Sequence, residues 1–307
     1  MSWPNATTYP DRATWLDARR AGLGASDVPK VLGLSPYGGP WSVWASKKLA
    51  TWSTPDNAAM RRGRGLEAGV LDWWVQELHA NGTQVSAAPT ALTHVMGPAP
   101  LLVTPDAEVF GLRGQKHAGA EVKTDTTRFR WGPTGTTIHR WTREAAELVR
   151  EDYAAQCYAC IAATGAPFWV LIVATSLSDL RWYVLLSDKR IEDAIVQRCQ
   201  RWWATHIEGG TPPDVDDTDA CRRAMAAMFP PRERKRERPA TPDEVWLAQC
   251  HQQATRQRQV AETTRNHAAA RLLASIGTTG HDTVTFPGGR ATRVHRGGSV
   301  SVRVTTK

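Results

Sequence analysis

The sequence lacks any long hydrophobic run. Its longest strongly apolar stretch, residues 168–174, is far shorter than the ~20 residues that a membrane-spanning helix needs. The N-terminal residues 1–6 include neither a basic segment nor an apolar one, so no secretory signal is visible. These absences predict a cytoplasmic protein with no membrane partner.

Cysteine is scarce, with five residues in a chain of 307. Thiols stay reduced in the cytoplasm, and a chain of this length with 41% hydrophobic residues buries a core without disulfides. Cys157 and Cys160 are close in sequence, which invites a metal or iron-sulfur interpretation. They fall inside a predicted helix, and the other cysteines supply no second close pair, so we expect core residues.

Acidic residues are scarce relative to basic ones only in the last quarter of the chain. Residues 230–307 hold 14 Lys or Arg against 6 Asp or Glu, and this difference equals the net charge of +8 of the whole chain. A basic segment attached to a neutral body indicates a polyanionic partner, most often nucleic acid. The composition, with 30 Arg against 8 Lys, also results from a GC-rich genome, so both explanations stay open.

The spacing of apolar residues predicts the order of helices and strands. Helices are predicted at residues 14–21, 57–79, 143–164, 188–207 and 241–276. A further helix is predicted to follow the turn at residues 22–27, with Ser26 as its N-terminal cap. A meander of strands is predicted at residues 84–88, 91–95, 101–104, 107–112 and 118–124, with further strands at 168–174, 181–186, 283–286, 291–295 and 299–305. The chain shows no internal repeat.

A charged segment at residues 230–240 divides the chain. It has the composition of a solvated basic linker, with mixed charges, prolines and no large apolar side chain. It separates a domain at residues 1–229 from an accessory part at residues 241–307, a helical arm with a small β element. The first part combines helices and strands, as in an α/β (α+β) domain.

Two carboxylates and a lysine stand on neighbouring predicted strands. Asp106 follows an apolar run, and Glu121-Val122-Lys123 lies inside the strand predicted at 118–124. Residues at i and i+2 of a strand face the same side, so Glu121 and Lys123 project together while Val122 points into the opposite core. A phosphodiester hydrolase needs carboxylates that hold Mg²⁺ and a cation that orients or deprotonates the attacking water. The alternative is an exposed cross-strand salt bridge.

Two predicted helices add polar residues to this set. Glu67 lies at the edge of the apolar stripe of the helix at 57–79 and brings a third carboxylate toward the metal, unless it is only a charge near the helix N-terminus. Gln156 interrupts the apolar face of the helix at 143–164, where an amide is costly unless it is hydrogen-bonded. We therefore expect Gln156 to face a polar site, with a buried structural glutamine as the alternative.

Six short segments occur in an order that resembles a known family. They are Gly22-Leu-Gly-Ala-Ser26-Asp27, Leu32-Gly-Leu-Ser-Pro36-Tyr37, Gly63-Arg-Gly-Leu-Glu67, Thr104-Pro105-Asp106, Glu121-Val-Lys123-Thr124 and Tyr153-Ala-Ala-Gln156-Cys-Tyr158. The ordered set resembles the YqaJ-like viral recombinases, phage alkaline exonucleases similar to lambda exonuclease within the PD-(D/E)XK nuclease superfamily. The resemblance covers roughly residues 14–213 and is far more specific than any single motif.

The resemblance implies a restriction-endonuclease-like core, with a central mixed sheet flanked by helices. It also implies dependence on Mg²⁺, with Mn²⁺ as a substitute. It implies 5′ to 3′ degradation of one strand of linear double-stranded DNA, which leaves 3′ single strands for recombination. Asp106 and Glu121 match the metal carboxylates, and Lys123 matches the catalytic lysine. With the Val122 carbonyl, they form the expected strand-borne part of the site and hold one or two ions.

The helix-borne residues match the family as well. Glu67, also as a metal ligand, and Gln156 match the members of the site that come from helices, whereas Arg19 and Ser26 match positions that hold the terminal 5′-phosphate. The expected partners are double-stranded DNA ends, further copies of the chain in a ring such as a trimer, and a single-strand annealing recombinase. The expected location is the cytoplasm of a bacterial host, with the protein encoded by a phage or prophage.

Two other functions remain open at this point. An endonuclease of the same superfamily uses the same catalytic set, and the substrate end discriminates between the two enzymes. An inactive, nuclease-derived DNA-binding protein is the other alternative, although the complete set of Asp106, Glu121 and Lys123 speaks against it.

Overall fold

The computed structural model describes residues 3, 5–49, 56–90, 92–114, 117–125, 127, 129–230, 237–296 and 299–306. The chain divides into two compact units, Met1–Pro231 and Arg232–Lys307. The predicted linker at 230–240 lies largely outside the described residues, so it stays a prediction.

A six-stranded mixed sheet forms the centre of the first unit. Its strand order is β2-β5-β6-β8-β9-β7. The strands are β2 (Ser86–Pro89), β5 (Ala107–Phe110), β6 (Ala118–Thr124), β8 (Phe168–Ala174), β9 (Leu180–Leu186) and β7 (Thr136–Ile138). The pairs β6–β8 and β7–β9 are parallel and the other pairs are antiparallel. The antiparallel pairing of β5 with β6 places the carboxyl end of β6 beside the start of β5, where the predicted site residues lie.

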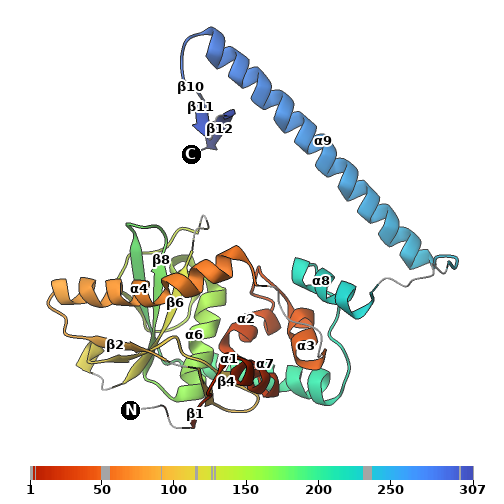
Figure 1. Cartoon of the computed structure of the whole chain (residues 1–307). Helices are drawn as coiled ribbons and strands as arrows, with labels where there is room; N and C mark the ends of the chain where they lie inside the picture. The colour runs from red at the N-terminus through yellow and green to blue at the C-terminus, as the bar shows by residue number, and fades with distance from the viewer. Residues whose placement is uncertain are drawn as a thin grey trace. The chain divides into compact units, whose positions relative to one another are not determined.

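Two long helices cover the two faces of this sheet (Figure 1). Helix α4 (Ala58–Ala80) begins at Asn57, whose side chain accepts from the Met60 amide at 2.9 Å, and it ends before Gly82, which has a left-handed φ of 78°. Its Trp74 belongs to the same buried cluster as Val122 of β6. Helix α6 (Glu151–Thr164) packs on the other face and ends at Gly165, with a φ of 69°. The predicted α/β class, with a mixed sheet flanked by helices, is confirmed.

The predicted meander is wrong, because two of its strands belong to a separate sheet. Strands β1 (Ala6–Thr8), β3 (Thr93–Met96) and β4 (Leu102–Val103) form a three-stranded sheet in the order β1-β3-β4. The Leu102 amide also donates to the Leu23 carbonyl at 2.8 Å, which ties this sheet to the turn after α1. Alternating hydrophobicity locates a strand but carries no information on its partner.

The predicted helix at 143–164 is divided in the structure into α5 (Arg143–Leu148) and α6. Val149 between them is extended, with φ −136° and ψ 136°. The Leu148 carbonyl accepts from the Gly132 amide at 3.0 Å, and the Arg150 guanidinium binds Asp152 and Asp125. These long-range contacts interrupt a helix that the spacing of apolar residues favours as continuous.

Shorter helices complete the first unit. They are α1 (Arg12–Ala18), α2 (Val28–Val31), α3 (Pro40–Lys48), α7 (Lys189–Trp202), which continues as a π-helical turn at Trp203–Glu208, and α8 (Asp219–Met228), with 3₁₀ turns at Arg19–Ala21, Ala25–Asp27 and Leu112–Gly114. Ser26 does not cap α2 as predicted, because its hydroxyl accepts from Arg19 instead, and Asp27 accepts from the Gly24 amide at 3.1 Å. Cys157 and Cys160 are fully buried in α6, as the core interpretation predicted.

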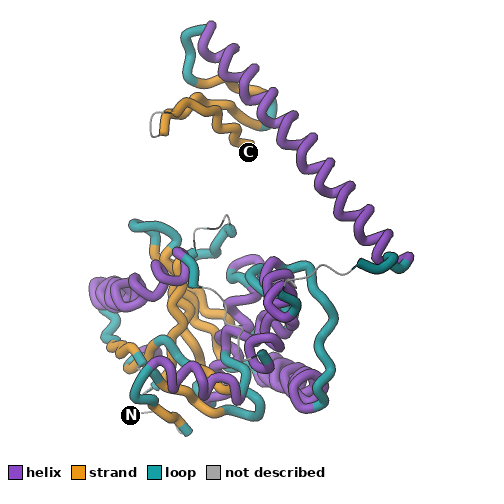
Figure 2. The backbone as a smooth tube through the Cα atoms, turned by 45° about the vertical axis from the view of Figure 1, so that its right-hand side comes forward, coloured by secondary structure: helices purple, strands orange, loops and turns teal. Residues whose placement is uncertain are grey.

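The second unit is a long helix followed by a small sheet. Helix α9 (Pro242–Thr278) begins with a reciprocal cap, in which Thr241 and Glu244 each accept from the other's amide. Strands β10 (Thr283–Phe286), β11 (Gly289–Arg296) and β12 (Ser299–Thr306) follow as an antiparallel sheet beside the end of α9 (Figure 2). In both units, no helix of the described residues is long and apolar enough to cross a membrane.

Candidate active site

The carboxylate of Asp106 sits at the edge of β6, where β5 begins. The Val122 amide donates to Asp106 Oδ2 at 2.8 Å, and the Asp106 amide donates to the Ala120 carbonyl at 3.3 Å. The N–H and C=O of one strand residue point to the same side of the strand. The Val122 carbonyl therefore points to the side of β6 on which Asp106 lies. At this point β6 extends past Ala107 and Ala120, the residue pair at which β5 begins.

Glu121 is the most deeply buried member of the site, with 1% of the residue exposed. Its Oε1 atom accepts from Gln156 Nε2 of α6 at 2.5 Å and from Lys123 Nζ on the same strand face. Lys123 is 22% exposed, so the ion pair lies at the margin of the core and not in open solvent. The alternative of an exposed salt bridge is therefore wrong for Glu121, and Gln156 faces a polar site, as predicted.

Crowding of the carboxylates changes their protonation. Burial, followed by the negative charge of Asp106, raises the pKa of Glu121 to about 8. The same two causes, in the same order, raise the pKa of Glu67 to about 7. Burial lowers the pKa of Lys123, but the charges of Glu121 and Asp106 outweigh burial, so the pKa of this ammonium lies above its ordinary value. Lys123 therefore stands beside two glutamates whose ionisation is disfavoured by the charge of Asp106.

Glu67 reaches this group from α4. The charges of Asp106 and Lys123 both act on its pKa, in opposite directions, which places Glu67 near them. No hydrogen bond joins the Glu67 carboxylate to another described residue. Its role as a metal ligand stays a prediction.

A divalent cation fits the geometry around Glu121. Glu121 Oε2 is buried and has no hydrogen-bond partner among the described residues, which is costly for a carboxylate oxygen unless something binds it. A cation at this oxygen would also remove the repulsion from Asp106. No three His, Cys, Asp or Glu side chains of the described residues form a complete metal site. Mg²⁺ is commonly bound by one or two carboxylates together with water, and Asp106, Glu121 and the Val122 carbonyl are the groups that would hold it here.

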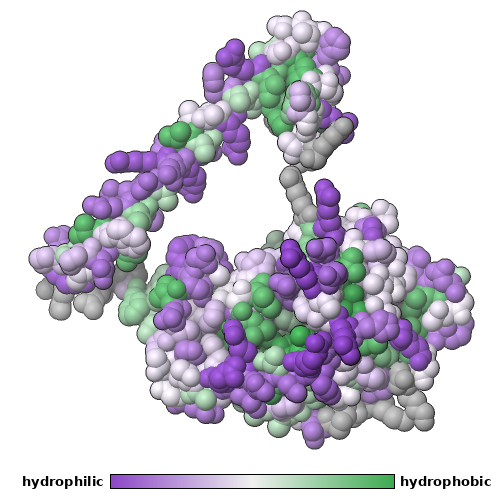
Figure 3. All heavy atoms as spheres, turned by 180° about the vertical axis from the view of Figure 1, so that it is seen from behind, coloured by the Kyte–Doolittle hydropathy of each residue, from purple (hydrophilic) through white to green (hydrophobic). Residues whose placement is uncertain are grey.

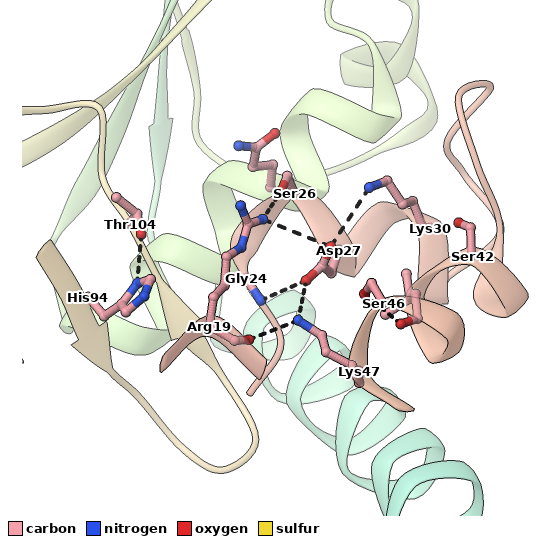
Figure 4. Close-up of polar contacts among 12 residues, drawn as sticks. Arg19, Gly24, Ser26, Asp27, Lys30, Ser42, Ser46, Lys47, His94 and Thr104 are labelled. Atoms are coloured by element: carbon pink, nitrogen blue, oxygen red, sulfur yellow. Dashed lines mark hydrogen bonds and ion pairs between the residues drawn. The ribbon is translucent and has the colours of Figure 1, made fainter. Parts of the chain in front are cut away.

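A second cluster of charges surrounds the buried carboxylate of Asp27 (Figure 4). Arg19 Nη2 donates to Ser26 Oγ at 2.6 Å and lies 3.9 Å from Asp27 Oδ1. Lys47 Nζ donates to Asp27 Oδ2 at 3.0 Å, and Lys30 Nζ lies 3.7 Å from Asp27 Oδ1. Three cations therefore meet one carboxylate, and the cluster has a net positive charge. The two residues predicted to hold a phosphate, Arg19 and Ser26, are brought together here.

The charges of this cluster keep Asp27 ionised. Burial raises the pKa of Asp27, but the charges of Lys47, Arg19 and Lys30 outweigh burial and hold the pKa well below its ordinary range. Lys47 is itself almost fully buried, and it also donates to the Arg19 carbonyl at 3.0 Å. Asp27 and Lys47 thus position the arginine backbone and guanidinium from two sides.

A histidine connects the two clusters. His94 Nε2 lies 3.0 Å from the Trp15 carbonyl, which only accepts, so Nε2 carries the hydrogen and Nδ1 accepts from the Thr104 hydroxyl at 2.9 Å. Burial, with the charges of Arg19 and Lys47, lowers the pKa of His94, which keeps the ring neutral. Thr104 precedes Asp106 by two residues, and Figure 4 shows the His94–Thr104 pair beside Arg19. The Thr104–Asp106 segment therefore spans from one cluster to the other.

Sequence reasoning missed an arginine that stands next to the site. The Arg150 guanidinium lies 4.3 Å from the centre of the Tyr153 ring, and Lys123 Nζ lies 5.6 Å from the same centre. Arg150 also lines an open cavity of about 380 Å³ together with Leu34, Pro36, Phe129, Ala146, Glu151 and Asp152. The only signal in the sequence is a charged residue inside an apolar-spaced helix. Lys47 had even less signal, because α3 was not predicted at all, and Asp27 was noted only as the last residue of the Gly22–Asp27 motif.

The fold and the two neighbouring carboxylates identify the first unit as an α/β domain with an acidic site at the carboxyl end of β6. As predicted, the chain belongs to the family of YqaJ-like viral recombinase domains. The sequence profile of the family matches residues 14–167, whereas the resemblance was expected to extend to residue 213. No curated protein matches the chain in sequence.

Solved structures include similar chains. The alkaline exonuclease LHK-Exo from Laribacter hongkongensis shows 15% identity and a TM-score of 0.44, and the match covers 71% of this chain and 100% of that chain. The crystal structure of LHK-Exo in complex with dAMP shows 14% identity and a TM-score of 0.47, with the same coverage of both chains.

Proposed function

We propose that the protein is a Mg²⁺-dependent exonuclease of the lambda-exonuclease type. It degrades one strand of linear double-stranded DNA from the 5′ end and leaves 3′ single strands for phage-type recombination, with Mn²⁺ as a substitute ion. The observation that carries the proposal is Glu121. It is buried beside Asp106, hydrogen-bonded by Lys123 and Gln156, and left with one oxygen that has no partner among the described residues. Family membership supports the same activity.

Each residue of the site has a chemical task in this proposal. Asp106, Glu121 and the Val122 carbonyl hold the cation, which supplies Lewis-acid polarisation of the phosphate and charge stabilisation. Lys123 keeps its proton while paired with Glu121, so its ammonium is suited to orient the attacking water and to offset developing negative charge. Gln156 fixes Glu121 Oε1, which leaves Oε2 directed away from both donors.

The cluster around Asp27 is proposed to hold the 5′ end. A phosphate attracts guanidinium and ammonium groups, and charge-assisted hydrogen bonds to it are stronger than neutral ones. Arg19 and Ser26 are already joined at 2.6 Å, and the three cations outnumber the one carboxylate. The expected ring-shaped homo-oligomer and the annealing recombinase belong to the same proposal and rest on family membership alone.

The deciding experiment uses linear duplexes labelled at either the 5′ or the 3′ end, with Mg²⁺ or with EDTA. We expect early release of the 5′ label as mononucleotide in Mg²⁺ and none in EDTA. Release of the 5′ label on fragments of intermediate length, without 5′-labelled mononucleotide, would indicate an endonuclease, and no hydrolysis under any metal condition would indicate a DNA-binding protein.

A matched pair of variants ties the activity to the site. Glu121→Gln should lower the rate by several orders of magnitude, because it removes a ligand charge at constant size. Glu108→Gln is the control, since this β5 carboxylate stands on the neighbouring strand and lies 3.5 Å from His117 instead. Equal rates for the two variants would contradict the assigned site.

A further inference from the structure

The small sheet of the second unit has two chemically different faces. Directly opposed residues share a face, so Thr292 lies on one face with Thr283 and Arg303, whereas Ala291 lies on the other with Val284 and Val304. We call the first face the Thr/Arg face. It includes Thr283, Thr285, Arg290, Thr292, Arg303 and Thr305.

The opposite face is the one that packs on the helix. Ala291 is fully buried, as is Ile276 in the last turns of α9, and both β11 and β12 contact this helix. Arg293 also belongs to this face, and its guanidinium donates to Asp282 at 2.5 Å. The Thr/Arg face therefore points away from α9, and its arginines and most of its threonines are exposed.

Arg290 and Arg303 of the Thr/Arg face have no ion pair with any described residue. Residues 279–307 contain five Lys or Arg and a single acidic residue, Asp282, which Arg293 already engages. Exposed guanidinium groups with no carboxylate nearby leave a net positive surface. On the face visible in Figure 3, which is seen from behind, hydrophilic groups also follow much of α9.

We propose that the Thr/Arg face is a docking surface for the phosphate backbone of duplex DNA. Guanidinium and hydroxyl groups are the donors that contact DNA phosphates most often, and a positive surface complements the negative duplex. Arg290 and Arg303 provide the charge, and the Thr283, Thr285 and Thr305 hydroxyls add neutral donors around it.

The composition of the face favours this occupant over two others. Single-stranded DNA is held by aromatic side chains that stack on the bases, but the aromatic residue of the sheet, Phe286, stands opposite Gly289 on the helix-packed face. Protein interfaces are centred on large apolar anchors, and Val294 is the only such side chain on the Thr/Arg face. The exposed valines Val300 and Val304 belong to the other face.

The test measures binding of the full chain to a long linear duplex across a salt series in EDTA, which prevents hydrolysis. The double variant Arg290→Ala/Arg303→Ala should reduce the slope of log affinity against log salt by about 2, because each phosphate contact contributes about 0.9. Arg290→Lys/Arg303→Lys should keep most of the slope, because it keeps the charge. The molecular mass of each variant is measured in parallel.

The control removes two positive charges that are already paired. Arg222→Ala/Arg265→Ala changes the net charge by the same amount, but Arg222 lies 2.7 Å from Asp219 and Arg265 lies 3.7 Å from Glu262. An unchanged slope in the Arg290/Arg303 variant would overturn the proposal. An equal reduction of the slope in the Arg222/Arg265 control would overturn it as well. A loss that comes with a change of molecular mass would assign the face to subunit assembly. A loss of affinity for single-stranded DNA, with unchanged affinity for the duplex, would also overturn the proposal.

This inference does not rest on the catalytic site. The binding assay contains EDTA, so it gives its answer even if the labelled-duplex experiment shows no hydrolysis. Conversely, the Arg290/Arg303 variant should degrade a short duplex at low salt as fast as the unmodified protein. Failure of one proposal therefore leaves the other standing.

Discussion

Replacing Glu121 with glutamine should make the metal-free protein less sensitive to alkaline pH. In the folded protein, the pKa of Glu121 is raised by burial and by Asp106 from an ordinary value of 4.5 to about 8. An acid with a raised pKa in the folded state stabilises the fold at pH values below 4.5. That stabilisation is lost as the pH rises toward 8, since the unfolded chain releases its proton first.

The size of the effect follows from the two pKa values. Each pH unit between them costs about 1.4 kcal/mol, because only the unfolded state is ionised there. Between pH 6 and pH 9 the free energy of unfolding should therefore fall by about 3 kcal/mol more in the unmodified protein than in Glu121→Gln. Lys123 adds nothing to this difference, because its pKa is raised and lies outside the interval.

The assay is urea unfolding in EDTA at both pH values, followed by tryptophan fluorescence. Subtracting the pH-induced change of Glu121→Gln from that of the unmodified protein cancels the titrating groups that the two proteins share, and Glu108→Gln serves as the matched control. Mg²⁺ should then stabilise the unmodified protein more at pH 9 than at pH 6 and leave Glu121→Gln unaffected. An identical pH dependence of the unmodified protein and Glu121→Gln would refute the reasoning, since Glu121 would then ionise as easily in the folded chain as in the unfolded one.

Three further predictions concern the same unit. Lys123→Ala should abolish hydrolysis without unfolding the chain, and a tenth of the normal rate would move the catalytic site elsewhere. Arg19→Ala should slow degradation of 5′-phosphorylated duplexes most, and an equal loss on 5′-hydroxyl duplexes would rule out a phosphate-specific role. Asp27→Asn should lower the free energy of unfolding by about 3–5 kcal/mol, because three cations lose their only carboxylate. The unmodified protein should lose this contribution as the pH falls below Asp27's ordinary pKa of 3.8, and a urea-unfolding difference under 1 kcal/mol at pH 7 would contradict the account.

Local patterns were sufficient where a residue's role depends on its immediate neighbours. The alternation along β6 predicted that Glu121 and Lys123 share a face and that Val122 is buried on the other, and both hold. The helix at 58–80 was predicted because its apolar spacing and end signal agree along the chain, and the helix at 242–278 because the segment is rich in Ala, Gln, Glu and Arg. The strands of the small C-terminal sheet were predicted by the same alternation, although the sequence carried no information on which face α9 covers.

Long-range contacts decided the rest. Leu148 pairs with Gly132 and so ends a helix that spacing alone predicted as continuous, and β3 leaves the main sheet to join β1 and β4. Sequence separation hides such partners, because a hydrogen bond or a rung of a sheet depends on where another segment lies.

The amino-acid sequence by itself determined the fold class, the family and the candidate carboxylates and lysine, since these follow from local periodicity and from motifs in a fixed order. Only the tertiary structure decided that Glu121 retains a buried oxygen with no partner among the described residues, and that Asp27 gathers Arg19, Lys30 and Lys47. Burial and charge coupling set these properties. Both depend on groups that lie far apart in the chain and that meet only when it folds.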